Sequence, residues 1–244
     1  MPRLADFDTL TFDCYGTLID WESGMIDALG PLTSRLARVD RDDVLQRHAF
    51  HESEQQRRTP TKPYREILAI VYRRLADEWG LPVEGAECRR YGESVKNWPA
   101  FPDAADSLEA LAAHYRLVIL SNVDNESFAA SNDKLGVRFD AVYTAEDIGS
   151  YKPADANFVH MISELAGLGV DKSKILHTAE SLFHDHGPAN RHGLASCRIH
   201  RRHDRPGFGA TRRPDTTPTY DFRFVSLAEM VAARRAEDTD RLTR

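Results

Sequence analysis

The stretch Thr9-Leu10-Thr11-Phe12-Asp13-Cys14-Tyr15-Gly16-Thr17-Leu18-Ile19-Asp20 begins with a short β-prone run and continues into an aspartate and a glycine. This pattern is typical of a buried strand that ends in a turn. Similar short runs follow along the chain, with helical patterns between most of them; the runs lie at 117–120, 141–143, 175–177, 196–199 and 222–225, and the helical patterns at 104–114, 126–135, 157–165 and 188–192. Strands that alternate with helices predict right-handed crossovers and a parallel sheet covered by helices on both faces. The fold class expected is therefore α/β.

The stretch from residue 21 to residue 98 interrupts this alternation, because it contains only helical patterns, at 25–37, 41–56, 64–79 and 84–96. It ends at Trp98-Pro99-Ala100-Phe101-Pro102, where two prolines prevent a continuous helix. We expect an α/β core made of residues 1–20 and 99–244, and an inserted all-helical cap domain made of residues 21–98. Such a cap would lie over the carboxyl ends of the strands, where open parallel sheets bind ligands.

Composition narrows the functional classes. The chain has 244 residues and a formal net charge of -6, with a pI of about 5.9, which argues against a nucleic-acid binder. It contains no apolar run long enough to span a bilayer and no secretory start, so we expect a cytoplasmic protein without a membrane partner. Its three cysteines are widely spaced and form no C-x-x-C pair, so reduced thiols are expected. The charged tail from about Ala236 is expected to fray.

Polar residues follow four of the predicted strands. These polar residues lie within four segments, Asp13 to Leu18, Ser121-Asn122, Lys152-Pro153 and 180–185. Because the carboxyl ends of parallel strands share one edge of a sheet, these residues should converge there and bind a small-molecule substrate.

With these four clusters the chain resembles the haloacid dehalogenase superfamily, from Phe12 to about Leu227. Within this superfamily, one motif resembles the type II 2-haloacid dehalogenases more closely than the phosphatases. It is Asp13-Cys14-Tyr15-Gly16-Thr17-Leu18-Ile19-Asp20. The resemblance implies a Rossmann-like core, a helical cap and a hydrolase with an aspartate nucleophile that needs no cofactor. It also implies a possible homodimer.

Tyr15 carries the distinction between the two activities. Phosphatases of this superfamily have a second aspartate two residues after the nucleophile, and it protonates the leaving oxygen. A halide leaves without a proton, whereas an alkoxide leaves poorly without one. Tyr15 therefore favours cleavage of a carbon–halogen bond in short 2-haloalkanoic acids. The alternative is that Tyr15 packs under the cap of an enzyme whose acid lies elsewhere.

The resemblance also assigns roles to residues. Asp13 would attack the halogen-bearing carbon and form an ester, and the ammonium of Lys152 would hold its pKa down. Thr17 and Ser121 would orient Asp13 or bind the substrate carboxylate. The residues implied to bind substrate are Tyr15, Asn122, Glu180 and, from the cap, Arg47 as a clamp for the carboxylate or the halide.

The segment after the fourth predicted strand leaves an alternative open. It reads Ala179-Glu180-Ser181-Leu182-Phe183-His184-Asp185, where type II dehalogenases carry a Ser-Ser-Asn pattern. The spacing of Glu180 and Asp185 is similar to that of magnesium phosphatases, in which case Asp13 and Asp185 would hold Mg²⁺. Without a metal, Asp185 would pair with Lys152 or position water at the ester. A catalytically weak regulatory protein is a third interpretation.

Overall fold

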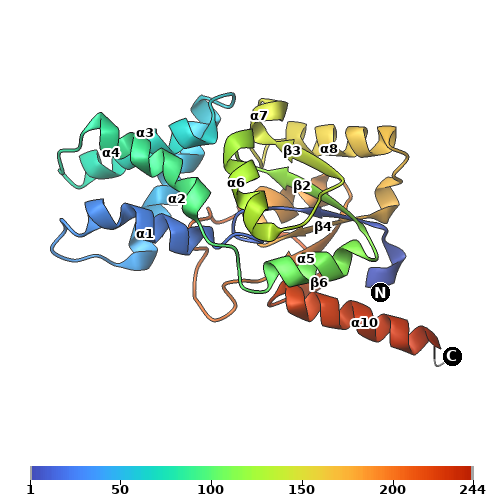
Figure 1. The fold of residues 1–244 in the computed structure, drawn as a ribbon. Helices are drawn as coiled ribbons and strands as arrows, with labels where there is room; N and C mark the ends of the chain where they lie inside the picture. The colour runs from blue at the N-terminus through green and yellow to red at the C-terminus, as the bar shows by residue number, and fades with distance from the viewer. Residues whose placement is uncertain (1, 243–244) are drawn as a thin grey trace.

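The computed structural model describes residues 2–242 and is built on a six-stranded sheet whose neighbouring strands all run parallel (Figure 1). The strand order is β3-β2-β1-β4-β5-β6. The strands are β1 (Thr9–Phe12), β2 (Arg116–Ser121), β3 (Ala141–Thr144), β4 (Ile175–Ala179), β5 (Ala195–Ile199) and β6 (Phe222–Phe224). Each predicted strand is confirmed, and so is the α/β class. Because β1 pairs with β2 on one side and β4 on the other, its carboxyl end lies at the centre of the sheet edge.

Helices cover both faces of this sheet. On one face, Leu117 and Ile119 of β2 share a core with α5 (Ala104–Ala112), α6 (Asn125–Leu135) and α10 (Leu227–Leu242). The alternate residues Val118 and Leu120 pack on the other face against α8 (Asp155–Gly167) and α9 (Gly187–Arg191). Side chains alternate between the faces of a strand, so a strand that is apolar at every position requires cover on both sides.

The chain between β1 and α5 is helical, as expected for the cap. Its helices are α1 (Trp21–Thr33), α2 (Arg41–Arg58), α3 (Tyr64–Glu78), α4 (Gly85–Gly92) and the 3-10 helix η2 (Glu93–Asn97). They form a layer of their own beside the sheet in Figure 1. The cap and the core share a continuous set of buried apolar side chains, and Tyr15 of the core packs edge to face on Trp98 of the cap segment. No helix within residues 2–242 combines the length and apolar character that spanning a bilayer requires.

The charged end of the chain differs from expectation. Residues from Ala236 continue α10 to Leu242 instead of fraying. The carboxylate of Glu237 accepts hydrogen bonds from the backbone N–H groups of Leu4 and Ala5, both at 2.8 Å. These two bonds satisfy free donors at the start of the 3-10 helix η1 (Leu4–Asp6) and tie the two ends of the described chain together.

Candidate active site

Asp13 follows the last residue of β1 directly and lies at the carboxyl edge of the sheet. Its backbone N–H donates to the carbonyl of Thr178, which continues the ladder with β4 by one step. The chain then turns sharply at Gly16, whose φ of 94° lies in the region that favours glycine. This turn leaves the Asp13 side chain, only 8% exposed, in the wall of a pocket between the sheet edge and the cap.

Lys152 lies between two carboxylates in this pocket. Its Nζ donates to Asp13 Oδ1 at 2.9 Å and to Asp185 Oδ1 at 2.7 Å. A third bond, to the carbonyl of Leu120 at 2.8 Å, uses the remaining ammonium hydrogen. Burial alone would lower the pKa of Lys152, but the two carboxylates outweigh burial and raise it, so the lysine is a cation at neutral pH.

Asp185 belongs to the π-helical turn η4 (Leu182–His186) and is fully buried. Its Oδ1 also lies 3.0 Å from His177 Nε2, and the other ring nitrogen of His177 lies 2.8 Å from the hydroxyl of Thr11. Burial would raise the pKa of Asp185, but Lys152 and His177 outweigh burial and lower it. Burial raises the pKa of Asp13, and Lys152 opposes that rise. On balance the pKa of Asp13 remains raised, so Lys152 favours the anion of Asp13 and offsets part of the effect of burial.

Thr17 holds the second oxygen of Asp13. Its hydroxyl donates to Asp13 Oδ2 at 2.8 Å and accepts from the backbone N–H of Glu180 at 2.9 Å. This contact fits the first of the two roles expected for Thr17, the orientation of Asp13.

Asn122 and Ser121 end β2 in different ways. The Asn122 side chain donates to the carbonyl of Lys152 at 2.9 Å and accepts from the N–H of the same residue at 2.6 Å. It therefore positions the lysine backbone, and it also lines the pocket. Ser121 is buried outside the pocket lining, and within the described residues its hydroxyl has no hydrogen-bond partner.

Tyr15 points its hydroxyl away from the nucleophile. The hydroxyl lies 2.7 Å from Ser131 Oγ and 3.2 Å from the carbonyl of Ser127, both on α6. The ring lines the pocket and packs against Tyr64 and Trp98 of the cap segment. Burial raises the pKa of the phenol well above its usual range. The side chain at this position is a wall of the pocket and a poor proton donor.

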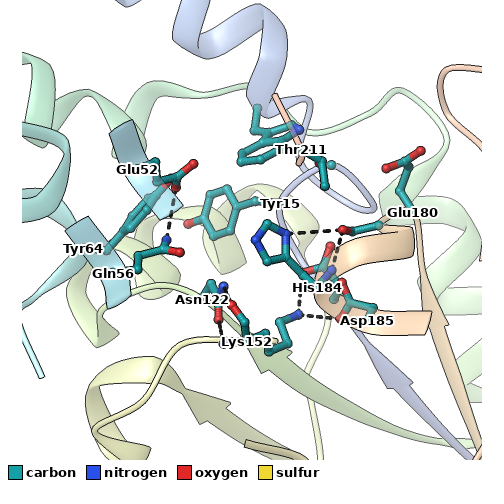
Figure 2. A pocket seen from close by; sticks show the side chains of 14 residues that line it. Tyr15, Glu52, Gln56, Tyr64, Asn122, Lys152, Glu180, His184, Asp185 and Thr211 are labelled. Carbon is teal, nitrogen blue, oxygen red and sulfur yellow. Dashed lines mark hydrogen bonds and ion pairs between the residues drawn. The ribbon is translucent and has the colours of Figure 1, made fainter. Parts of the chain in front are cut away.

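The cap closes the pocket with three polar side chains that the sequence analysis missed, namely Glu52, Gln56 and Tyr64 (Figure 2). Gln56 Nε2 donates to Glu52 Oε1 at 3.3 Å. Glu52 and Gln56 are four residues apart on α2, and His48 precedes them by four; all three are buried. Polar residues that repeat every four positions lie on one face of a helix, so this spacing could have indicated from the sequence that these side chains face the pocket together. The pocket also contains Trp21, at the start of the cap segment, and, from the core, Ser181, His184 and Thr211, to which the sequence analysis gave no role.

Arg47 lies outside this pocket, so the expectation that it clamps the substrate is wrong for this structure. Its guanidinium pairs with Asp43 at 2.8 Å and with Glu78, and it is 39% exposed. The reason is helical phase: Arg47 lies five residues before Glu52, and that rotation places it on the outer face of α2.

The proposed magnesium ligands fit the ion poorly. Lys152 contacts Oδ1 of both Asp13 and Asp185, and Thr17 contacts Oδ2 of Asp13. Of the oxygens of these two carboxylates, only Oδ2 of Asp185 has no hydrogen-bond partner among the described residues and is left for a divalent cation. Glu180 pairs with Arg198 at 3.5 Å. Among residues 2–242 no three His, Cys, Asp or Glu side chains are arranged so that they could hold a metal ion.

Glu52 gives a testable pH dependence of stability. Burial raises its pKa from 4.5 to about 7, and Tyr64 opposes the rise. The folded state therefore binds the proton of Glu52 more tightly than the unfolded state does. The contribution of this proton to the free energy of unfolding is complete below pH 4.5 and is lost as the pH rises to about 7. In urea unfolding, the wild-type protein should lose roughly 3 kcal/mol of unfolding free energy between pH 5 and pH 8 because of Glu52. The variant Glu52→Gln should not show this loss.

Glu54→Gln, on the same helix but with a partly exposed carboxylate, is the matched control and should leave the pH dependence unchanged. An identical pH dependence in wild type and Glu52→Gln would show that Glu52 does not hold a proton in the folded state.

A capped parallel α/β fold, with an acid–lysine–acid arrangement at the carboxyl edge of its sheet, defines this chain as an enzyme of the hydrolase class. The family model for haloacid dehalogenase-like hydrolases matches residues 7–178, and the chain belongs to that family. No curated protein matches it.

Solved structures share the fold. The L-2-haloacid dehalogenase PA0810 superposes with a TM-score of 0.75 at 22% identity, over 94% of this chain and 99% of its own. The L-2-haloacid dehalogenase from Xanthobacter autotrophicus with chloropropionic acid covalently bound has a TM-score of 0.75 at 20% identity, over 94% and 98%. The HAD-hydrolase YfnB from Bacillus subtilis bound to magnesium superposes with a TM-score of 0.73 at 18% identity, over 96% of this chain and 100% of its own. At these identities the likeness shows the fold alone.

Proposed function

We propose that the chain is a hydrolytic dehalogenase of short 2-haloalkanoic acids that forms a covalent ester on Asp13. The observation that carries this proposal is that Asp13 contacts a lysine while the hydroxyl of Tyr15 is bonded elsewhere. The ammonium of Lys152 lies 2.9 Å from Asp13 and favours its anion, while Tyr15, where phosphatases carry their acid, turns its hydroxyl to Ser131. A site with a strong nucleophile and no acid at that position suits a leaving group that departs without a proton.

Two steps follow from this arrangement. In the first, a carboxylate oxygen of Asp13 forms a bond to C2 of the substrate while the carbon–halogen bond breaks, and the halide takes the bonding electrons. In the second, water adds to the carbonyl carbon of the Asp13 ester and loses a proton to a base. The ester bond then breaks, and the departing alkoxide takes up the proton held by the base, which releases the 2-hydroxyalkanoic acid. The Asp13 carboxyl group loses its remaining proton to solvent and is restored as the carboxylate.

The comparisons support the first step. The Xanthobacter autotrophicus dehalogenase carries chloropropionic acid covalently bound on the same fold. The expected independence from cofactors also belongs to this proposal. The magnesium phosphatase is the alternative, and the fold likeness to YfnB bound to magnesium and the position of Glu180 in the pocket favour it.

The decisive experiment measures both products. With 2-chloropropionate and a metal chelator, purified protein is expected to release chloride at a rate unaffected by the chelator. With a panel of small phosphate esters and Mg²⁺, it is expected to release no phosphate above background.

Arg47→Ala serves as a control, because Arg47 lies outside the pocket, and its turnover should stay within about twofold of wild type. Phosphate release that requires Mg²⁺, with no chloride from any 2-haloacid, would establish the phosphatase instead.

A further inference from the structure

Two cavities of very different size meet beside Lys152. The pocket that contains Asp13 has a volume of about 30 Å³, which is enough for a few water molecules. A second cavity of about 380 Å³ adjoins it. Both cavities are lined by Gln56, Lys152 and His184, so these side chains form the boundary between them. The first pocket offers little room for a hydrocarbon side chain, and the second offers the adjacent space.

The larger cavity lies between the end of α2 and the core. Its walls include the rings of Tyr151, Phe183, Pro60 and Pro153. Tyr151 is buried, and its hydroxyl donates to the carbonyl of Lys62 at 2.6 Å, so the polar end of the ring is occupied. Rings without free polar groups are suited to contact with hydrocarbon.

Positive charge lies at the same cavity. Arg57 and Arg212 both line it, and the guanidinium of Arg212 lies 5.9 Å from the centre of the Phe183 ring. Arg212 belongs to the loop after β5, and its side chain is exposed. An apolar chamber with cations along its wall fits an amphipathic anion better than a neutral hydrocarbon.

We propose that this chamber, lined by Tyr151, Phe183 and Arg212, binds the hydrocarbon side chain of an anionic substrate, so that the preferred substrates are 2-haloalkanoic acids with a chain of several carbons. The proposal rests on the proposed function for the identity of the reacting group, but the chamber itself is testable without any reaction. In this proposal the positive charge that attracts the anionic substrate to the site is that of Arg212, and not that of Arg47.

Binding of unreactive carboxylates tests the chamber independently of halide release. By titration calorimetry, octanoate is expected to bind wild-type protein at least about tenfold more tightly than acetate, since each buried methylene contributes about threefold to fourfold. Halide release should follow the same order, with kcat/KM larger for 2-bromohexanoate than for 2-bromopropionate.

Two variants that fill the chamber should remove this preference. Ser53→Phe, on α2, and Ala154→Phe, at the start of α8, each place a ring in the chamber and should weaken octanoate binding at least about tenfold, with acetate unchanged. Ser34→Phe, at an exposed position outside the chamber, is the matched control. Two independent positions guard against a variant that fails to fold.

Arg212→Gln should weaken octanoate binding about threefold to tenfold and leave octanamide binding unchanged, whereas Arg213→Gln should affect neither. Octanoate that binds no more tightly than acetate, or octanoate binding that survives both phenylalanine variants, would overturn the proposal. Octanoate binding that behaves as described, in a protein that releases no halide, would retain the chamber and reject only the dehalogenase.

Discussion

Asp13→Asn is expected to reduce chloride release from 2-chloropropionate by at least about 10⁴-fold, since the amide has no anionic oxygen with which to attack carbon. The substitution keeps the size of the side chain, but its single amide oxygen can accept either from Thr17, in the place of Oδ2, or from Lys152, in the place of Oδ1, and not from both. The unfolding transition of the variant is therefore measured beside the activity, so that a loss of fold is distinguished from a loss of the nucleophile. Asp27→Asn, at an exposed position on α1, is the matched control and should retain full turnover.

Heavy-oxygen water distinguishes the ester from direct hydrolysis in the wild-type protein. If the ester forms, water attacks the carbonyl carbon of Asp13, so the first turnover places the isotope in the side chain of Asp13 and not in the product. Peptide mass spectrometry after a single turnover measures this label. Isotope that appears in the 2-hydroxy acid in the first turnover, with none at Asp13, would mean that water attacks the substrate directly.

The sequence predicted the sheet because its strands are buried on both faces. Runs such as Thr9 to Phe12 and Leu117 to Leu120 are apolar or β-branched at nearly every position, which excludes an exposed strand. The polar residues that follow these runs then lie at one edge of the sheet, which predicts that Asp13, Lys152 and Asp185 belong to one site. The contact between Lys152 and both acids agrees with that reasoning.

The cap was harder to predict because helical phase decides which side chains face the pocket. Distance along the chain suggested Arg47, yet the pocket contains Glu52 and Gln56, on another face of the same helix. The buried stripe of His48, Glu52 and Gln56 carried the needed information, since polar residues repeat there every four positions. The sequence analysis assigned no role to His177. Its Nδ1 lies 2.8 Å from the Thr11 hydroxyl because β4 pairs with β1 in the register that places the two residues opposite each other, and local sequence does not determine that register.

The larger cavity could not be predicted from local pattern at all. Its walls come from α2, from the segment around Lys152, from η4 and from the loop that carries Arg212. The basic segment 198–213 reads as a solvated loop in the sequence, because glycine and proline interrupt it. Only the tertiary structure brings one of its arginines to Phe183.

Lys152→Met is expected to impair both catalysis and stability, because it removes the cation between two buried carboxylates. Asp13 and Asp185 would remain, 6% and 0% exposed, without a compensating charge. Breaking a buried ion pair by removing one partner costs about 3–5 kcal/mol, so urea unfolding at pH 8 should show a loss of that size. The loss should shrink as the pH falls, since protonation of a carboxylate removes the uncompensated charge.

The same substitution changes the pH dependence of turnover in a direction that distinguishes a catalytic effect from general damage. Burial raises the pKa of Asp13 and Lys152 opposes that rise, so removing the lysine should raise the pKa further. At neutral pH more of Asp13 is then protonated and cannot attack. We expect turnover to fall at least about 10³-fold at pH 7, and the residual activity to increase with pH through a midpoint higher than that of wild type. Lys172→Met, an exposed lysine outside the pocket, should change neither quantity. An acid limb at the same pH in wild type and Lys152→Met would show that the ammonium does not control the charge of the nucleophile.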